Sequence, residues 1–193
     1  KHGSTVTKLV TSCYYLTLHL LSSDFASSFE RNQRWTIRQF FNIKMKMKKK
    51  INCFIPFGTP EDTMQTVKEL QVSELVNKIY LLGSEPGKKA LPGCEYLSVK
   101  GFYSTDTMKT IAANANTEYT LFYLKQTPLK LGLYALERMV QIMENDKKNG
   151  IVYADHYQLI NGELKQAPVI DYQPGSVRDD FDFGSILLFS SSA

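Results

Sequence analysis

The sequence predicts an α/β domain in which a mainly parallel β-sheet is flanked by helices on both faces. From residue 51 onward, short apolar segments alternate with longer segments whose apolar residues recur at helical spacing. Gly and Pro residues separate most of these segments, as they do between regular elements. The chain has 193 residues, of which 43% are hydrophobic. This is enough for one domain core and excludes the disordered, collagen-like and coiled-coil classes.

The first half of the predicted domain begins with a buried strand at residues 51–57, which Gly58 ends. Thr59 then has the character of an N-cap, with Pro60 at the first helical position, and the helix is predicted to reach about Asn77. The next predicted elements are a strand, a loop rich in Gly and Pro, and a strand, at residues 78–82, 83–93 and 96–99.

The second half repeats this alternation. Its predicted elements are a helix, a strand, a helix, a strand and a hairpin, at residues 104–115, 119–124, 127–145, 150–154 and 158–166. Thr127 and Pro128 repeat the N-cap signal at the start of the helix with the clearest apolar face. Asn161 and Gly162 form the strongest short turn signal in the chain and predict the hairpin.

The charge of the chain is divided unevenly. The net charge is +4, but residues 1–50 carry ten Lys and Arg against two Asp and Glu. Residues 51–193 carry thirteen Lys and Arg against seventeen Asp and Glu, so this larger part is mildly acidic. A nucleic-acid interface needs a basic surface, and we therefore predict no nucleic-acid partner for the domain.

Residues 1–46 are predicted to be a basic extension that is poorly ordered or not native, and residues 47–193 to be the domain. We expect the natural start at Met45 or Met47, directly before the first buried strand. The most apolar early run, residues 9–21, spans 13 residues where a membrane helix needs about 20. We therefore expect no integral membrane segment and a cytoplasmic location.

The three cysteines, Cys13, Cys53 and Cys94, share no metal-binding spacing, which indicates reduced thiols. No glycine-rich dinucleotide fingerprint, P-loop or nucleophile elbow occurs in the chain. Ligands of parallel sheets bind at the carboxyl ends of the strands. The loops of interest are therefore 57–62, 83–93, 125–130 and the segment from Asp155 onward.

Acidic residues gather near the end of the chain, in two places. Asp155 follows a predicted strand, and Asp179 and Asp180 follow Arg178. Such carboxylates can bind a hard divalent cation, and an arginine can bind phosphate through two hydrogen bonds. The alternative is a solvated turn whose acids cap the backbone and pair with Arg178.

Several segments occur together in an order that is familiar from a known family. They are Cys53-Phe54-Ile55-Pro56-Phe57-Gly58, residues 117–127 followed by Tyr134-Ala135-Leu136-Glu137-Arg138-Met139-Val140, Ile151-Val152-Tyr153-Ala154-Asp155-His156-Tyr157 with Asn161-Gly162, and Gly184-Ser185-Ile186-Leu187-Leu188-Phe189. With these segments, residues 51–193 resemble the nucleotide-sugar-binding part of family 2 glycosyltransferases, which have the GT-A fold.

The resemblance implies transfer of a sugar from a nucleotide-sugar donor to a glycan or other hydroxyl acceptor, in bacterial surface-glycan synthesis. It implies Mn²⁺ or Mg²⁺ as the metal and a closing strand near residues 184–189. The implied donor-binding residues are Pro56, Phe57, Gly58, Thr59, Lys125, Thr127 and Arg178, and the candidate metal ligands are Asp155, Asp179 and Asp180.

Two departures from the family pattern bear on the chemistry. Gly83 stands where the family has an Asp that contacts the nucleotide, and Lys125-Gln126-Thr127 stands where it has a metal-binding DxD motif. Lys125 can supply positive charge to a leaving diphosphate in place of the metal. The alternative is that Lys125 is an ordinary surface lysine. The chain also ends before the region where the family carries its catalytic base, so no catalytic residue is assigned.

Two alternatives to a glycosyltransferase remain open. One is a non-catalytic relic of the GT-A fold that acts as a binding module, which the loss of both acidic positions favours. The other is a sugar-phosphate nucleotidyltransferase. It requires a basic glycine-rich loop after the first strand, and loop 57–62 contains no basic residue.

Overall fold

The computed structural model describes residues 5–9, 50–85, 91–146, 148–170, 175 and 181–192. The chain divides into two compact units, residues 12–48 and the remainder. The first of these lies outside the described residues. Of the predicted N-terminal extension, the structure describes one strand, β1 (Thr5–Leu9).

Among the described residues, the main sheet has seven strands in the order β1-β6-β9-β5-β2-β3-β4. The strands after β1 are β2 (Ile51–Pro56), β3 (Val76–Gly83), β4 (Glu95–Ser98), β5 (Tyr119–Tyr123), β6 (Asn149–Ala154) and β9 (Ile186–Ser190). Strand β9 runs antiparallel to β5 and β6, and every other neighbouring pair is parallel. The predicted mainly parallel sheet is confirmed.

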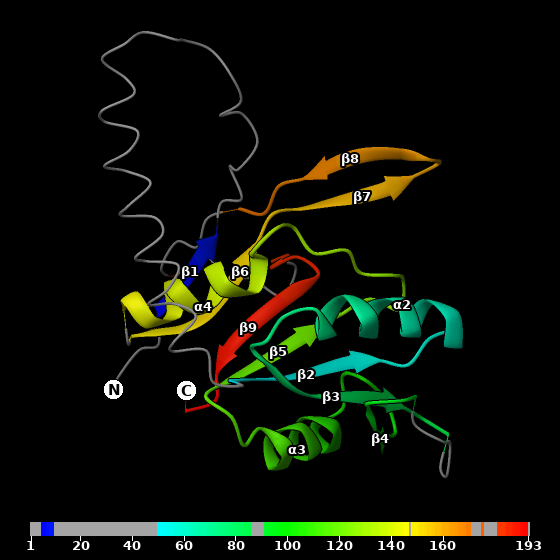
Figure 1. The fold of residues 1–193 in the computed structure, drawn as a ribbon. Coiled ribbons are helices and arrows are strands. Elements are labelled where there is room, and N and C mark those ends of the chain that lie inside the picture. The colour runs from blue at the N-terminus through cyan, green and yellow to red at the C-terminus, as the bar shows by residue number, and fades with distance from the viewer. Residues whose placement is uncertain are drawn as a thin grey trace, which may run out of the picture. The chain divides into compact units, whose positions relative to one another are not determined.

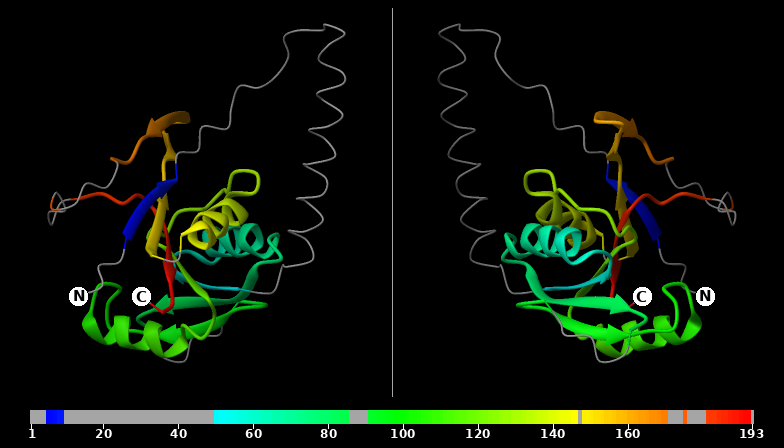
Figure 2. Two further views of the ribbon diagram at one scale, coloured as in Figure 1. Left: turned by 90° about the vertical axis from the view of Figure 1, so that its left-hand side faces the viewer. Right: turned by 90° about the vertical axis from the view of Figure 1, so that its right-hand side faces the viewer.

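Helices cover both faces of this sheet, as predicted. The helices are α2 (Pro60–Gln71), α3 (Thr105–Asn114) and α4 (Ala135–Asn145). Figure 1 shows α2 and α4 on one face and α3 on the other, and the two views of Figure 2 show the same division. The Ser73 hydroxyl, just after α2, donates to a Glu137 carboxylate oxygen of α4 at 2.9 Å, which ties the two helices together.

An aromatic stack forms the core beneath α3. Phe54 of β2 is completely buried and stacks on Tyr80 of β3, with ring centroids 4.8 Å apart, and on Phe122 of β5 at 5.9 Å. Ile111 of α3 packs into the same cluster. Successive residues of a strand point to opposite faces of the sheet, so Cys53, the residue before Phe54, faces α2 and α4. Burial raises the pKa of its thiol, which keeps Cys53 protonated.

The prediction that α2 reaches Asn77 is wrong, because this helix ends at Gln71. Strand pairing overrides the helical pattern after that point: Val76 pairs with Ile51, and the Asn77 side-chain amide donates to the Asn52 side-chain oxygen at 2.9 Å. The tertiary partners of these residues therefore decide where the helix stops.

The prediction that the helix ending near Asn145 begins at Thr127 and Pro128 is also wrong, because α4 begins at Ala135. Side chains of α2 take up the backbone donors of the preceding segment. The Leu129 amide donates to the Thr66 hydroxyl at 3.0 Å, and the Leu131 amide donates to a Glu69 carboxylate oxygen at 2.9 Å. These bonds hold the chain along α2 in a non-helical path.

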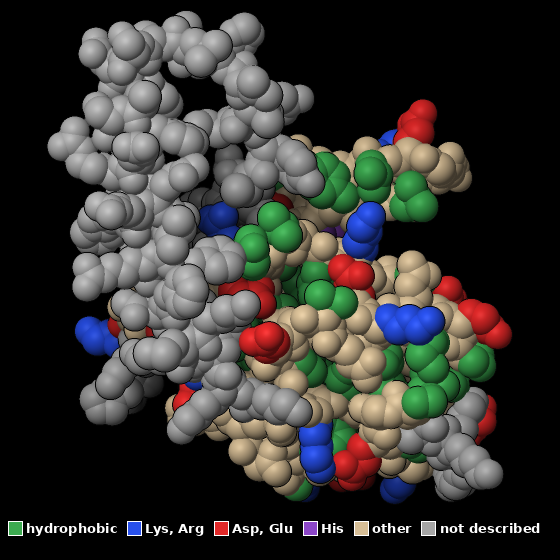
Figure 3. Space-filling model, in the orientation of Figure 1, with side chains coloured by type: hydrophobic (Ala, Val, Ile, Leu, Met, Phe, Trp, Pro, Cys, Tyr) green, Lys and Arg blue, Asp and Glu red, His purple; other side chains and the backbone are tan. Residues whose placement is uncertain are grey.

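The predicted hairpin is confirmed as β7 (His156–Ile160) and β8 (Glu163–Ala167), which form a separate two-stranded sheet. Asn161 and Gly162 both have positive φ, 53° and 83°, as a tight two-residue turn requires. Figure 3 shows hydrophobic side chains along this hairpin, and Tyr157, Leu159 and Leu164 are more than half exposed.

Within the described ranges, no helix combines the length and apolarity needed to cross a bilayer.

Candidate functional site

The direction of chain progression through the sheet reverses at β2. From β2 the chain proceeds outward to β3 and β4, and then returns to β5 on the other side of β2. In open α/β sheets such a switch point leaves a crevice at the carboxyl ends of the two central strands, and ligands bind there. In this protein the crevice lies where β2 ends at Pro56 and β5 ends at Tyr123.

A groove of about 500 Å³ lies at this switch point. Its lining comes from the loop after β2, the first turn of α2 and the loop after β5. The lining residues are Phe57, Gly58, Thr59, Asp62, Gln126 and Thr127. The groove is shallow and broadly open to solvent, and it is therefore accessible to a small ligand.

The two loops meet closely at Gly58. A Cβ atom at this position would lie 2.9 Å from the Gln126 carbonyl oxygen and 3.1 Å from the Gln126 Cβ. The Gln126 side-chain amide also donates to the Phe57 carbonyl at 3.2 Å. The position thus requires glycine because the backbones approach too closely for any side chain.

The first turn of α2 gives the groove a fixed polar wall. The Thr59 hydroxyl accepts from the Asp62 backbone amide at 3.2 Å and donates to Asp62 Oδ2 at 2.8 Å. These two bonds cap the helix and orient the Asp62 side chain. The opposite wall is tethered by Tyr123, whose hydroxyl donates to the Thr127 carbonyl at 2.9 Å. Burial raises the pKa of Tyr123, so this donor keeps its proton at neutral pH.

Four of the predicted donor-binding residues line the groove: Phe57, Gly58, Thr59 and Thr127. Pro56 is buried as the last residue of β2, and Lys125 is exposed beside the groove without lining it. Arg178 lies outside the described residues. Asp62 and Gln126 also line the groove. Both lie in loops that the sequence indicated, 57–62 and 125–130, but neither is among the predicted donor-binding residues.

Asp155, one of the candidate metal ligands, does not line this groove. Asp155 follows β6, and its Oδ1 accepts from the Val169 amide at 2.7 Å. Strand β9 lies between β5 and β6, so strand spacing puts Asp155 about 10 Å from the end of β5. Asp179 and Asp180 lie outside the described residues. In the described part of the chain, no group of three His, Cys, Asp or Glu residues could hold a metal ion.

Gly83, which stands where the resemblance implies an Asp, lies at the end of β3 against the side chain of Tyr96. A Cβ atom at Gly83 would collide with the hydroxyl of Tyr96, a β4 residue. The Tyr96 ring in turn contacts Phe57 edge to face, with centroids 5.9 Å apart. A side chain at position 83 would therefore require Tyr96 to move.

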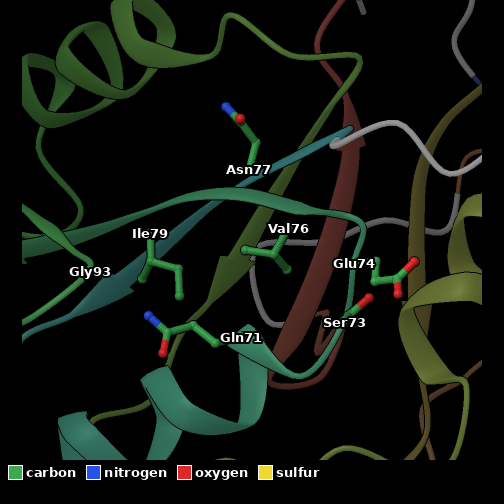
Figure 4. A pocket seen from close by; sticks show the side chains of 7 residues that line it. All are labelled: Gln71, Ser73, Glu74, Val76, Asn77, Ile79 and Gly93. Carbon is green, nitrogen blue, oxygen red and sulfur yellow. The ribbon is translucent and has the colours of Figure 1, made fainter.

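A second pocket, of about 330 Å³, lies at the opposite edge of the sheet, where α2 ends and β3 begins. Gln71, Ser73, Glu74 and Gly93 are among its lining residues (Figure 4). The Asn77 side chain points away from Gln71 and Ile79 (Figure 4). Its amide donates to the side-chain oxygen of the buried Asn52. This pocket lies at the amino ends of the strands, away from the switch point, and we therefore assign the functional site to the first groove.

No protein-family model, curated protein or solved structure matches this chain. The fold and the groove thus stand on the chain's own sequence and geometry.

Proposed function

We propose that this domain binds a nucleotide-sugar donor, as the donor-binding part of a family 2-like glycosyltransferase with the GT-A fold. One observation carries the proposal. Four of the seven residues that the resemblance implies for donor binding, Phe57, Gly58, Thr59 and Thr127, line one groove at the switch point of the sheet.

The order of the elements also supports this proposal. The resemblance implies a strand with a proline-containing loop, a later strand before a helix, a hairpin and a closing strand. The described elements include β2 with Pro56 at its end, β5 before α4, the hairpin β7–β8, and β9. The closing strand, β9, lies between β5 and β6, in the centre of the sheet.

The proposed reaction is an inverting transfer. A carboxylate base deprotonates the acceptor hydroxyl, which attacks the sugar carbon and displaces the nucleoside diphosphate. Lys125 is exposed beside the groove and lies next to Gln126 and Thr127 in the chain, a suitable position for a cation that stabilises the departing diphosphate. We assign the catalytic base to no residue of this chain.

The first test is a thermal unfolding assay of the full chain with UDP, GDP, CDP and dTDP, each with and without Mn²⁺. A ligand at about 100 times its dissociation constant adds roughly 2.7 kcal/mol of stability. For a domain of this size, that corresponds to a rise in Tm of about 5–10 °C. A rise with at least one nucleotide is the expected result. No rise with any nucleotide, for a protein that unfolds cooperatively, contradicts the proposal.

The binding-only alternative is favoured by one specific feature, the absence of both carboxylates from Lys125-Gln126-Thr127. The two functions differ in turnover. A transferase hydrolyses or transfers the sugar of the nucleotide sugar that it binds, and release of nucleoside diphosphate measures this. A binding module is also stabilised by the nucleotide, but it releases no nucleoside diphosphate from a nucleotide sugar.

A further inference from the structure

The lining of the switch-point groove is suited to hydroxyl groups rather than to phosphates. Among its described lining residues, Asp62 is the only charged one, and the others offer hydroxyls, an amide, an aromatic ring and a glycine backbone. A carboxylate repels a diphosphate at short range. Carboxylate, amide and hydroxyl groups are the partners that accept and donate hydrogen bonds to sugar hydroxyls.

Asp62 is held in place before any ligand arrives. Its backbone amide and its Oδ2 both bond to the Thr59 hydroxyl oxygen, in the capped first turn of α2. Oδ1 takes no part in these two bonds, and each carboxylate oxygen can accept more than one hydrogen bond. A side chain that is fixed in advance loses little entropy when a ligand binds.

We propose that Asp62 accepts hydrogen bonds from the vicinal diol of the donor's ribose, and that the phosphates lie outside the groove on the side of Lys125. This inference rests on the proposed function and deepens it. It makes Asp62 a residue that selects ribonucleotides over 2′-deoxyribonucleotides, because the deoxy sugar lacks one of the two hydroxyls that the carboxylate would bind.

The test is calorimetric titration of the full chain with UDP, GDP and CDP and with the 2′-deoxy form of each. For the nucleotide that binds, we expect the ribo form to bind about tenfold or more tightly than the deoxy form, as for the loss of a hydrogen bond to a charged group. Asp62→Ala is expected to remove this preference, and Asp62→Asn to weaken it while keeping an oxygen acceptor near Thr59.

Glu61→Ala is the matched control, because Glu61 lies in the same helical turn, has the same charge and does not line the groove. We expect it to leave the ribo preference unchanged. Thermal unfolding without ligand shows whether each variant is folded. Equal binding of the ribo and deoxy forms by the wild type overturns the inference but not the proposed function, and so does a preference that survives in Asp62→Ala. No binding of any nucleotide overturns both.

Discussion

Phe54→Ala is expected to lower the free energy of unfolding by about 3–5 kcal/mol. The Phe54 side chain is completely buried, and its ring stacks between Tyr80 and Phe122 on the two neighbouring strands. Removing it leaves a cavity at the centre of the parallel sheet, beneath α3. Domains of this kind are stable by only about 5–15 kcal/mol, so urea denaturation should show a large drop in the midpoint.

Leu133→Ala is the control for this prediction. The Leu133 side chain is 85% exposed in the loop before α4, and its truncation should change stability by less than about 0.5 kcal/mol. If the two variants had similar stabilities, the arrangement of β2 between β3 and β5 would be contradicted.

Gly58→Ala is expected to weaken nucleotide binding about tenfold or more and to lower stability by about 1–3 kcal/mol. The added Cβ would meet the Gln126 carbonyl oxygen at 2.9 Å, so the backbones of the two loops must separate. This separation widens the groove and lengthens the bond between the Gln126 amide and the Phe57 carbonyl. Titration with the nucleotide that stabilises the wild type measures the loss of affinity.

Gly101→Ala serves as the matched glycine control, because a Cβ atom at Gly101 has no neighbour within 4 Å. Its nucleotide affinity should equal that of the wild type. Wild-type affinity in Gly58→Ala would show that the ligand binds away from the meeting point of these two loops.

Local signals predicted the elements whose ends are set locally. Thr59 and Pro60 mark the start of α2, and Asn161 with Gly162 marks the turn of the hairpin, because the capping bond and the positive φ values arise within a few residues. The same Thr-Pro signal failed at residues 127–128. There, Thr66 and Glu69 of α2, a helix far away in the sequence, accept hydrogen bonds from the backbone amides of the following residues. No local sequence pattern reveals such partners.

For the site, the sequence predicted which loops contribute but not every side chain that they bring together. The rule that ligands bind at the carboxyl ends of strands indicated loops 57–62 and 125–130, and both loops line the groove. The contribution of Asp62 depends on where α2 begins relative to the end of β5, which is a tertiary relation. The sequence also could not predict that β9 runs antiparallel to its neighbours, because an apolar run has the same pattern in either direction.

The central claim is that a nucleotide occupies the groove between the ends of β2 and β5. It is tested most directly by recording backbone amide NMR spectra of the full chain during titration with the stabilising nucleotide. The account predicts that the largest shifts fall on Phe57, Gly58, Asp62, Gln126 and Thr127. Shifts centred instead on Gln71, Glu74 and Gly93, at the opposite edge of the sheet, would contradict it.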